Sequence, residues 1–392
     1  MQELIDLGWL EEPLDGNHGS IHPKTSDYVS TGVPFIMATD LRSGTVDYKN
    51  CAFITETQAA GLRKGFSHPG DVLLTHKATI GRTAIVPDTY KTIILTPQVT
   101  YYRVKKNIDN RYLKYYFDTP AFQITLSNWA GSGSTRAYLG ITAQKKLPVI
   151  LPEYAIQKRV ASILGILDDK IRNNNEINEN LQQQAFAFFE QLLSQSKGDL
   201  CMLCDIAELN PKRQLVKGVV ARCIDMAQLS TSGAFPSGWE MKPYNGGMRF
   251  TNGDTIIARI TPCLENGKTA FIDFLGDSEV AFGSTEYIVL ASKGSYPAEF
   301  FYCLARYPAF VDYAVKNMHG SSGRQRVSAD TLGKYLLPRI SEEEMVIFRN
   351  TVTAMFKVMQ NNSMENMRLS ALRDTLLPRL MSGELDVSSL DI

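Results

Sequence analysis

Four polar loops carry the side chains with the clearest chemical potential. In the first half of the chain they span residues 75–82 and 131–136, and in the second half they span 259–268 and 320–326. Arginine can pair with guanine, asparagine or glutamine with adenine, and serine or threonine with either base, while the amides of glycine and serine turns suit phosphates. The loops therefore predict binding to double-stranded DNA. Ordinary solvated turns are the alternative for any single residue, but the recurrence of this chemistry in both halves disfavours that alternative for the set.

The candidate DNA-binding residues come directly from these loops. In the first half they are Lys77, Thr79, Arg82, Ser132, Ser134, Thr135 and Arg136. In the second half they are Arg259, Thr261, Asn266, Lys268, Ser321, Ser322, Arg324, Gln325 and Arg326.

The sequence lacks the motifs of common catalytic and cofactor sites. It has no Gly-x-Ser-x-Gly elbow, P-loop, His-Glu-x-x-His or nucleotide-binding glycine fingerprint. Asn210–Arg213 resembles a DNA-methyltransferase loop but lacks its second proline and aromatic ring. Glu153, Asp168 and Lys170 are the residue types of a nuclease metal site, yet Asp168 and Lys170 fall on a predicted helix, where a solvated face is favoured. We expect no catalytic residue and no bound metal.

Composition narrows the class of protein. At roughly 150 residues per domain, 392 residues suggest two or three domains. The 41 basic and 41 acidic side chains exclude a bulk polycation that coats nucleic acid by charge alone. Six scattered cysteines, with Cys201 and Cys204 as a lone pair, indicate reduced thiols rather than disulfides or zinc. No apolar stretch could span a bilayer and the start lacks signal-peptide features, so we expect a cytoplasmic protein.

An internal repeat organises the chain. Gly70–Leu74 followed by Gly81–Ile85 predicts two short strands around a loop, and Gly253–Ile257 followed by Gly267–Phe271 repeats the pattern. The Gly-Ser-rich loops and the Leu-Pro pairs after them also recur. Such self-similarity indicates two copies of one unit of about 190 residues.

Each copy divides into a globular head and a long helix. Short runs of valine, isoleucine, tyrosine and phenylalanine between turn residues predict α+β heads, with one helix at 110–122 and its counterpart at 297–311. The predicted divisions are a first head at 1–150, a first long helix at 151–198, a second head at 199–338, and a second long helix with a C-terminal tail at 339–392.

The helical segments carry a seam whose residues step alternately by four and three. Its members in the first segment are Val160, Leu164, Leu167, Ile171, Asn174, Asn178, Leu181, Ala185, Phe188 and Leu192. In the second they are Phe348, Val352, Met355, Met359, Asn362, Asn366, Leu369, Arg373, Leu376 and Leu380. This spacing predicts a coiled coil, and two amphipathic helices packing on their own heads are the alternative. Arg373 is the poorest position of the seam, and Pro378 is expected to end or kink the second helix.

Four asparagines are predicted to fix the register of the coiled coil. If the helices pair antiparallel, Asn174 faces Asn366 and Asn178 faces Asn362. Asparagine across a seam costs stability but selects one register, since a slip of one heptad would bury amides against aliphatic side chains at about 1–3 kcal/mol per group. An antiparallel pair would relate the heads by a pseudo-twofold axis and hold them apart, because helices of about 45 residues span roughly 65 Å. Such a spacer suits a ligand that repeats about every 34 Å, as duplex DNA does.

The order of head, long helix, head and long helix resembles the specificity subunit of Type I restriction-modification enzymes. The matching residues are Gly32–Ile36, Gly70-Asp71 with Gly81–Ala84, the Gly-Ser-rich turns, and Leu151-Pro152 followed by Gln157–Arg159. The resemblance covers essentially the whole chain. Two features depart from it. The first head lacks an evident leading strand like Leu203–Pro211, and the start of the second long helix lacks the Gln-Lys-Arg form.

The resemblance implies a function without catalysis by this chain. Each head would be a target recognition domain that reads one half of a bipartite, asymmetric DNA site, and the different loops of the heads imply different half-sites. The helices would set the spacer and dock two modification (methyltransferase) subunits, with restriction (motor-nuclease) subunits joining the complex. The chain itself would hold no cofactor, whereas S-adenosylmethionine, ATP and Mg²⁺ would be bound by the partner subunits.

Three alternatives remain open at the level of sequence. The chain could be a self-contained enzyme with an unrecognised active site, or a two-headed scaffold that binds proteins instead of DNA. It could also be the specificity subunit of a system in which nuclease and methylase are fused. Catalytic turnover, salt-dependent DNA binding and partner identity would respectively discriminate these cases.

Overall fold

The structure is a computed structural model in which two compact units are resolved. It describes residues 1–131, 137–196, 198–321 and 323–389. Unit 1 comprises Met1–Asp168 with Ala371–Ile392, and unit 2 comprises Asp169–Ser370. Each unit therefore contains one head together with a part of both long helices. Within the described residues, no helix combines the length and the apolar character needed to cross a membrane.

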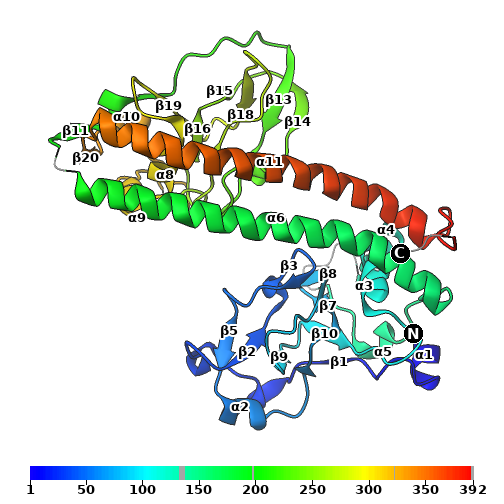
Figure 1. Cartoon of the computed structure of the whole chain (residues 1–392). Coiled ribbons are helices and arrows are strands. Elements are labelled where there is room, and N and C mark those ends of the chain that lie inside the picture. Colours follow the sequence, from blue (N-terminus) through cyan, green and yellow to red (C-terminus); the bar gives the residue numbers. More distant parts are fainter. Residues whose placement is uncertain (132–136, 197, 322, 390–392) are drawn as a thin grey trace. The chain divides into compact units, whose positions relative to one another are not determined.

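The first head is built from two four-stranded sheets (Figure 1). One is entirely antiparallel, in the order β1 (Leu14–Asp15), β10 (Val99–Tyr102), β7 (Val72–Lys77) and β8 (Thr79–Ile85). The other has the order β5 (Ala52–Ile54), β2 (Val33–Ile36), β9 (Ile93–Leu95) and β6 (Phe66–Ser67). In that sheet the central pair β2 and β9 is parallel and both outer pairs are antiparallel. The short strands β3 (Leu41–Arg42) and β4 (Thr45–Val46) form a separate hairpin.

The second head repeats this topology strand for strand. Its antiparallel sheet has the order β12 (Ala207–Leu209), β19 (Tyr287–Ser292), β16 (Thr255–Ala258) and β17 (Thr269–Phe271). Its mixed sheet has the order β14 (Glu240–Pro243), β13 (Val220–Ile224), β18 (Ala281–Gly283) and β15 (Met248–Phe250), again with a parallel central pair. A further two-stranded sheet joins β11 (Leu200–Met202) to β20 (Leu336–Pro338). The α+β class and the internal repeat expected from the sequence are therefore both present.

The first head does have a leading strand, contrary to the sequence-based expectation. β1 pairs with β10 just as β12 pairs with β19. A short helix precedes each of these strands, α1 (Gln2–Asp6) in the first head and α7 (Leu203–Ile206) in the second. With only two residues, β1 is too short to show the alternation of polar and apolar residues by which strands are predicted.

The expected helix in each head is divided by a proline. The first head has α3 (Asn110–Asp118) and α4 (Pro120–Trp129), and the second has α8 (Ala298–Arg306) and α9 (Pro308–Lys316). The residue before proline is disfavoured from helical geometry, while proline is well suited to the first helical position. The remaining short helices are α2 (Glu56–Ala60), α5 (Ile141–Gln144) and α10 (Ala329–Gly333), with 3₁₀ turns at Gly19–Ile21, Thr25–Asp27, Ala38–Asp40 and Met226–Gln228.

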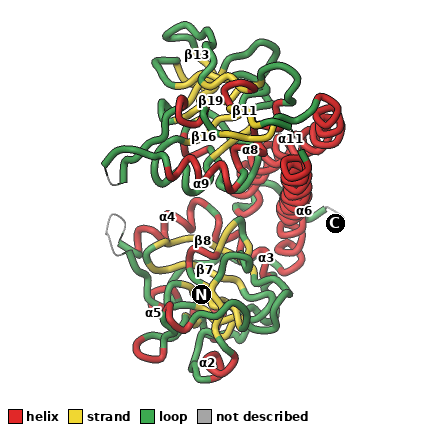
Figure 2. The backbone as a smooth tube through the Cα atoms, turned by 90° about the vertical axis from the view of Figure 1, so that its left-hand side faces the viewer, coloured by secondary structure: helices red, strands yellow, loops and turns green. Residues whose placement is uncertain are grey.

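The long helices α6 (Tyr154–Gln195) and α11 (Glu342–Met381) are each continuous (Figures 1 and 2). All twenty seam residues predicted from the sequence are buried or half-buried. α11 continues through Pro378 to Met381 rather than ending there, and the apolar side chains near the proline, Leu377 and Leu380, are buried. Their burial against unit 1 offsets the single backbone hydrogen bond that proline removes from the last turn.

The asparagines pair as expected from the sequence. Within unit 2, Asn174 Nδ2 donates to Asn366 Oδ1 at 2.9 Å, and Asn362 Nδ2 donates to Asn178 Oδ1 at 2.9 Å. Asn366 Nδ2 in turn donates to Asn175 Oδ1 at 2.8 Å. These contacts require α6 and α11 to run antiparallel within this unit. They are consistent with one preferred register, because a slipped pairing would leave the amides without these partners.

Each head packs on the helices of its own unit in a different way. In unit 2 a large aromatic core joins them, with Phe189 of α6, Phe300 of α8 and Phe348 of α11 all fully buried and in ring contact. In unit 1 the corresponding cluster is smaller and includes Tyr112 of α3 and Leu164 of α6. Polar contacts supplement the packing in unit 1.

Candidate nucleic-acid interface

The first candidate loop is the turn of the β7–β8 hairpin in the first head. Lys77 is exposed at the end of β7, Ala78 adopts a left-handed φ of 63°, and Thr79 is half-buried at the start of β8. Arg82 is also exposed, and its Nη1 donates to the main-chain oxygen of Ala38 at 3.2 Å. The hairpin therefore presents Lys77 to solvent, while the backbone of a neighbouring turn constrains Arg82.

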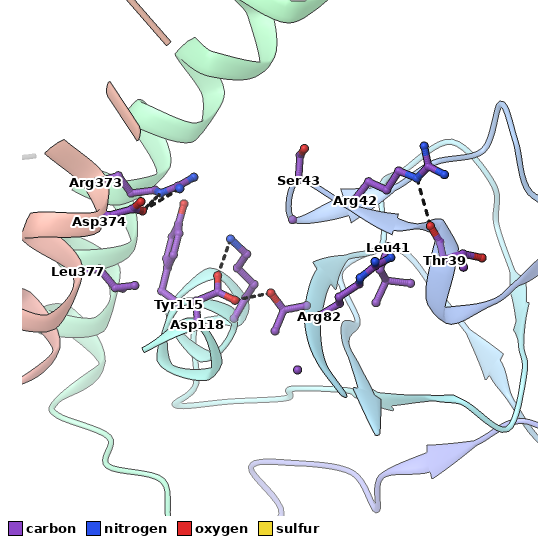
Figure 3. Close-up of a pocket in the computed structure, with 14 residues that line it drawn as sticks. Thr39, Leu41, Arg42, Ser43, Arg82, Tyr115, Asp118, Arg373, Asp374 and Leu377 are labelled. Carbon is purple, nitrogen blue, oxygen red and sulfur yellow. Dashed lines mark hydrogen bonds and ion pairs between the residues drawn. The ribbon is translucent and has the colours of Figure 1, made fainter. Parts of the chain in front are cut away.

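Arg82 lies on the wall of a cavity of about 700 Å³ in unit 1 (Figure 3). Besides Arg82, the cations lining it are Arg42, Lys114 and Arg373. Each has a partner within the protein: Arg42 Nε donates to the Thr39 carbonyl, Lys114 pairs with Asp118 at 2.8 Å, and Arg373 pairs with Asp374 at 2.8 Å. Because these cations are already engaged, the cavity is better explained as structural than as a preformed anion site.

Arg373 also explains how a charged residue is accommodated on the seam. Its Nη1 donates to Asp168 Oδ1 at 2.8 Å, and Asp168 Oδ2 accepts a hydrogen bond from the Tyr115 hydroxyl at 2.7 Å. Burial acts to raise the pKa of Asp168, but Lys114, Arg373 and Tyr115 outweigh it and the pKa is lowered. The sequence-based interpretation of Asp168 as a solvated helix position was wrong, because α3 covers that face of α6.

Replacing Arg373 by methionine is expected to destabilise unit 1 by about 1–3 kcal/mol at neutral pH. This lies between the values typical of exposed and of buried ion pairs, since the Arg373 and Asp168 side chains are 30% and 24% exposed. The lowered pKa of Asp168 means that its stabilisation is present above the unfolded-state pKa of about 3.9 and is lost as pH falls through the folded-state value. The difference in unfolding free energy between variant and wild type, measured by denaturant unfolding, should therefore become smaller in acid.

The matched control is Arg379→Met, which removes a more exposed pair with Glu384. It should change the unfolding free energy by less than about 1 kcal/mol. A loss in the Arg373 variant that stays constant from neutral pH down to about pH 3 would contradict the role given to ionised Asp168.

Lys77 also lines a smaller cavity of about 310 Å³ in the first head, together with His18, His22 and Gln98. His18 Nε2 lies 3.0 Å from Oδ2 of the buried Asp15. The Gln98 Oε1 accepts a 3.4 Å hydrogen bond from the Ala38 amide. Side chains able to donate and accept hydrogen bonds therefore surround Lys77, including several that sequence analysis did not select.

In the second head, the first candidate loop follows β16. Thr261 donates through both its amide and its hydroxyl to the Gln325 main-chain oxygen, at 3.1 and 3.2 Å. Asn266 is exposed, whereas the Lys268 ammonium donates to the Met226 carbonyl at 2.6 Å. Thr261 thus ties this loop to the second candidate loop, Asn266 remains accessible, and Lys268 serves the internal structure.

The second candidate loop of this head contains a bidentate ion pair. Arg326 Nε and Nη2 both donate to the Glu286 carboxylate, with donor–acceptor distances of 2.8–3.0 Å. Arg259 Nε lies 3.4 Å from the same carboxylate. These contacts lower the pKa of Glu286, with the hydrogen bonds from Arg326 as the largest cause. Arg324 and Ser321 are exposed, and Gln325 is half-buried.

Part of the predicted set cannot be placed. Ser132, Ser134, Thr135, Arg136 and Ser322 lie outside the described residues. Among the residues that are described, no group of three or more histidine, cysteine, aspartate or glutamate side chains could hold a metal ion. Over the same part of the chain, Cys201 is buried and Cys204 is exposed, and both are free thiols.

The two heads bring equivalent backbone positions together at this junction. The His76 amide donates to the Gln98 carbonyl in the first head, and the Arg259 amide donates to the Glu286 carbonyl in the second, both at 3.0 Å. The backbone of Tyr138 forms an isolated antiparallel β-bridge with Lys77, and the backbone of Arg326 forms the same kind of β-bridge with Ile260. One scaffold thus carries His76, Gln98 and Tyr138 in the first head, whereas it carries Arg259, Glu286 and Arg326 in the second.

Sequence reasoning missed Gln98 and Glu286. Gln98 directly precedes the buried strand β10 and lies three residues after the end of β9. Glu286 directly precedes the buried strand β19 and lies three residues after the end of β18. Comparing the loops between these matched strands in the two copies would have shown that the loops have equal length but different chemistry. That difference is the signal by which both residues could have been found.

Comparison with known proteins shows which proteins this chain resembles. Residues 14–183 match the Type I restriction modification DNA specificity domain. The specificity subunit of the Type I restriction enzyme MjaIX from Methanocaldococcus jannaschii is 24% identical over 414 residues, covering 94% of this chain and 90% of that protein. The HindI specificity subunit from Haemophilus influenzae is 24% identical over 318 residues, covering 61% of this chain and 69% of that protein.

A solved structure extends the likeness to the fold. The crystal structure of a Type I restriction-modification system S subunit from M. genitalium aligns with a TM-score of 0.57 and 15% identity, covering 95% of this chain and 93% of that one. At this identity the likeness supports the fold alone. The matched domain and the two relatives make this chain similar to Type I restriction-modification specificity subunits.

Proposed function

We propose that each head binds one half of a bipartite, asymmetric DNA site. The observation that carries the proposal is the repetition of one two-sheet topology in both heads. The strands of the first head lie within residues 14–183, which match a DNA specificity domain. The exposed members of the predicted contact set are Lys77 and Arg82 in the first head and Asn266, Ser321 and Arg324 in the second, while Arg259 and Arg326 are half-buried. Different side chains on equivalent backbones support different half-sites.

The long helices would set the length of the unspecified DNA between the half-sites. α6 has 42 residues and α11 has 40, and a continuous helix of about 40 residues is roughly 60 Å long. The hydrogen bonds between Asn174 and Asn366 and between Asn362 and Asn178 support one register of the pair. A fixed register is what a constant spacer requires.

The same helices offer surface for two modification subunits, with restriction subunits completing the complex. Their exposed large hydrophobic side chains are 44–59% accessible and comprise Tyr154, Ile166 and Ile177 of α6 and Val346, Ile347, Val358 and Leu372 of α11. We propose that these side chains contribute to the contact with a protein partner. In this proposal the chain is the non-catalytic part of the complex, and S-adenosylmethionine, ATP and Mg²⁺ belong to its partners.

Arg324→Ala should weaken binding to one half-site only. Arg324 is exposed and no side-chain partner is found for it within the described part of the chain, so its guanidinium is available to DNA. Loss of a base contact should cost about 1–3 kcal/mol and relax sequence preference at one position. Binding of the complete complex to duplexes altered in either half-site would measure this.

Arg368→Ala, which removes an exposed arginine of α11, is the control and should leave both half-site preferences unchanged. Equal weakening of binding to every duplex by Arg324→Ala would assign that residue to a phosphate. Affinity of the wild-type complex for duplex DNA that does not fall with log salt concentration would count against DNA binding itself and favour a protein-binding scaffold.

A further inference from the structure

The junction of Glu286, Arg259 and Arg326 in the second head has the properties of a base-reading site. The three side chains are 25%, 32% and 38% exposed, so they are held by one another yet remain accessible. Arg326 also has a fixed main chain, since its amide and carbonyl exchange hydrogen bonds of 2.9 Å with His319. Base recognition requires such positioning, because a loosely held guanidinium loses much of its selectivity.

The hydrogen-bond inventory of Arg326 leaves two donors free. A guanidinium has five N–H groups. Glu286 accepts from Nε and from Nη2, and the Arg324 carbonyl accepts from Nη1 at 3.1 Å. One N–H therefore remains on each terminal nitrogen. Guanine presents two acceptors, O6 and N7, on its major-groove edge.

Charge favours a base over a phosphate at this position. The Glu286 carboxylate lies 2.8 Å from the Arg326 guanidinium, and the pKa of Glu286 is lowered by that contact, which keeps it ionised at neutral pH. A carboxylate this close repels a phosphate, whereas it does not oppose the neutral edge of a base. The cation is thus oriented at the expense of its attraction to the DNA backbone.

The first head supplies an internal comparison. At the equivalent backbone positions it carries Gln98 in place of Glu286 and Tyr138 in place of Arg326, and the His76 and Tyr138 rings lie 5.7 Å apart. A requirement of the fold alone would be expected to preserve the ion pair in both copies. Its replacement on an unchanged backbone fits a position that differs because the DNA sequence it contacts differs.

We propose that Arg326 reads a guanine in the half-site bound by the second head, with Glu286 as its positioning residue. The inference rests on the proposed function and adds to it a base identity and a residue that the sequence did not indicate. Arg259, whose Nε faces the same carboxylate, would reinforce the positioning of Glu286.

The test uses the complete complex with its modification subunits and duplexes carrying the motif that it methylates. Replacing one particular guanine of the second half-site by adenine should weaken binding of the wild-type complex about 5- to 150-fold, the value of one bidentate pair. Replacing that guanine by 7-deazaguanine, which lacks the N7 acceptor, should also weaken it. Arg326→Lys keeps the positive charge but loses the two parallel N–H donors of the guanidinium. The affinities of this variant for the guanine, 7-deazaguanine and adenine duplexes should therefore lie within a few-fold of one another.

Glu286→Gln separates positioning from a purely structural role. It should raise affinity for non-specific DNA, because a negative charge is removed, while reducing the preference for guanine at the same position. The inference would be overturned if the Arg326→Lys complex retained the full preference for guanine. It would also be overturned if the variant lost affinity equally for all duplexes and its affinity depended less steeply on salt concentration, because that result indicates a phosphate contact. Failure of the wild-type complex to bind any sequence selectively would instead contradict the proposed function.

Discussion

Inserting one heptad into each long helix should abolish methylation at the original sites and transfer it to sites with a longer spacer. The matched positions are between Arg172 and Asn173 in α6 and between Met367 and Arg368 in α11, since the asparagine pairs relate opposing residues whose numbers sum to 540. Seven residues add about 10 Å of helix, equivalent to at most about three base pairs of duplex. The two half-site sequences should not change, because neither head is altered.

The insertion spares the hydrogen bonds of the asparagine pairs and the Arg373–Asp168 ion pair, and its main local loss is the exposed ion pair between Lys170 and Glu365. The control for that loss is Lys170→Ala, which should leave the methylated motif unchanged. An unaltered spacer in a stable complex that carries both insertions would refute the role of the helices as a ruler. A changed half-site sequence would show instead that the insertions had distorted a head.

Phe348→Ala should destabilise unit 2 by about 3–5 kcal/mol, the range for emptying a buried phenylalanine site. Phe348 is fully buried, and its ring centroid lies 5.9 Å from that of Phe300 and 6.0 Å from that of Phe188. It therefore connects α11 with both α8 and α6. Hydrogen exchange followed by mass spectrometry should show the loss in residues 169–370 and leave the first head protected as in the wild type.

The neighbouring Ile347→Ala is the matched control, because Ile347 is 58% exposed and its truncation should change stability by about 0.5 kcal/mol or less. A loss below about 1 kcal/mol for Phe348→Ala would mean that this aromatic core does not attach the second head to the helices.

The elements that could be predicted from the sequence are those with a repeated or periodic signal. The strands around Gly70 and Gly253 recur in both copies, and the alternating steps of the seam place Asn174 opposite Asn366 once an antiparallel direction is assumed. Burial of an amide is tolerable only beside another polar group, so the asparagines indicate the register. They do not indicate the direction, because a parallel pair would place Asn174 opposite Asn362 and Asn178 opposite Asn366. Both signals are local and need no knowledge of the tertiary contacts.

What could not be predicted depends on contacts between distant segments. Asp168 lies outside the seam and resembles a solvated position, but the Tyr115 hydroxyl reaches it from α3. Arg326 was selected as a candidate DNA-binding residue without a partner being predicted for it, and Glu286, forty residues earlier, holds its guanidinium. No spacing rule connects these pairs, because loop closure brings them together only after the sheets have formed. The DNA-binding loops therefore stay a prediction, while the contacts of individual side chains within them emerged from the structure.

A methylome measures the central claim most directly. The chain would be co-expressed with its modification subunit in a host free of DNA methylation, and N6-methyladenine would be mapped across the genome. The expected result is one split motif with two different half-sites and a constant spacer. In the Arg326→Lys variant, the requirement for guanine should be lost at a single position of that motif. A continuous motif, or methylation that survives deletion of either head, would contradict the division of DNA recognition between the two heads.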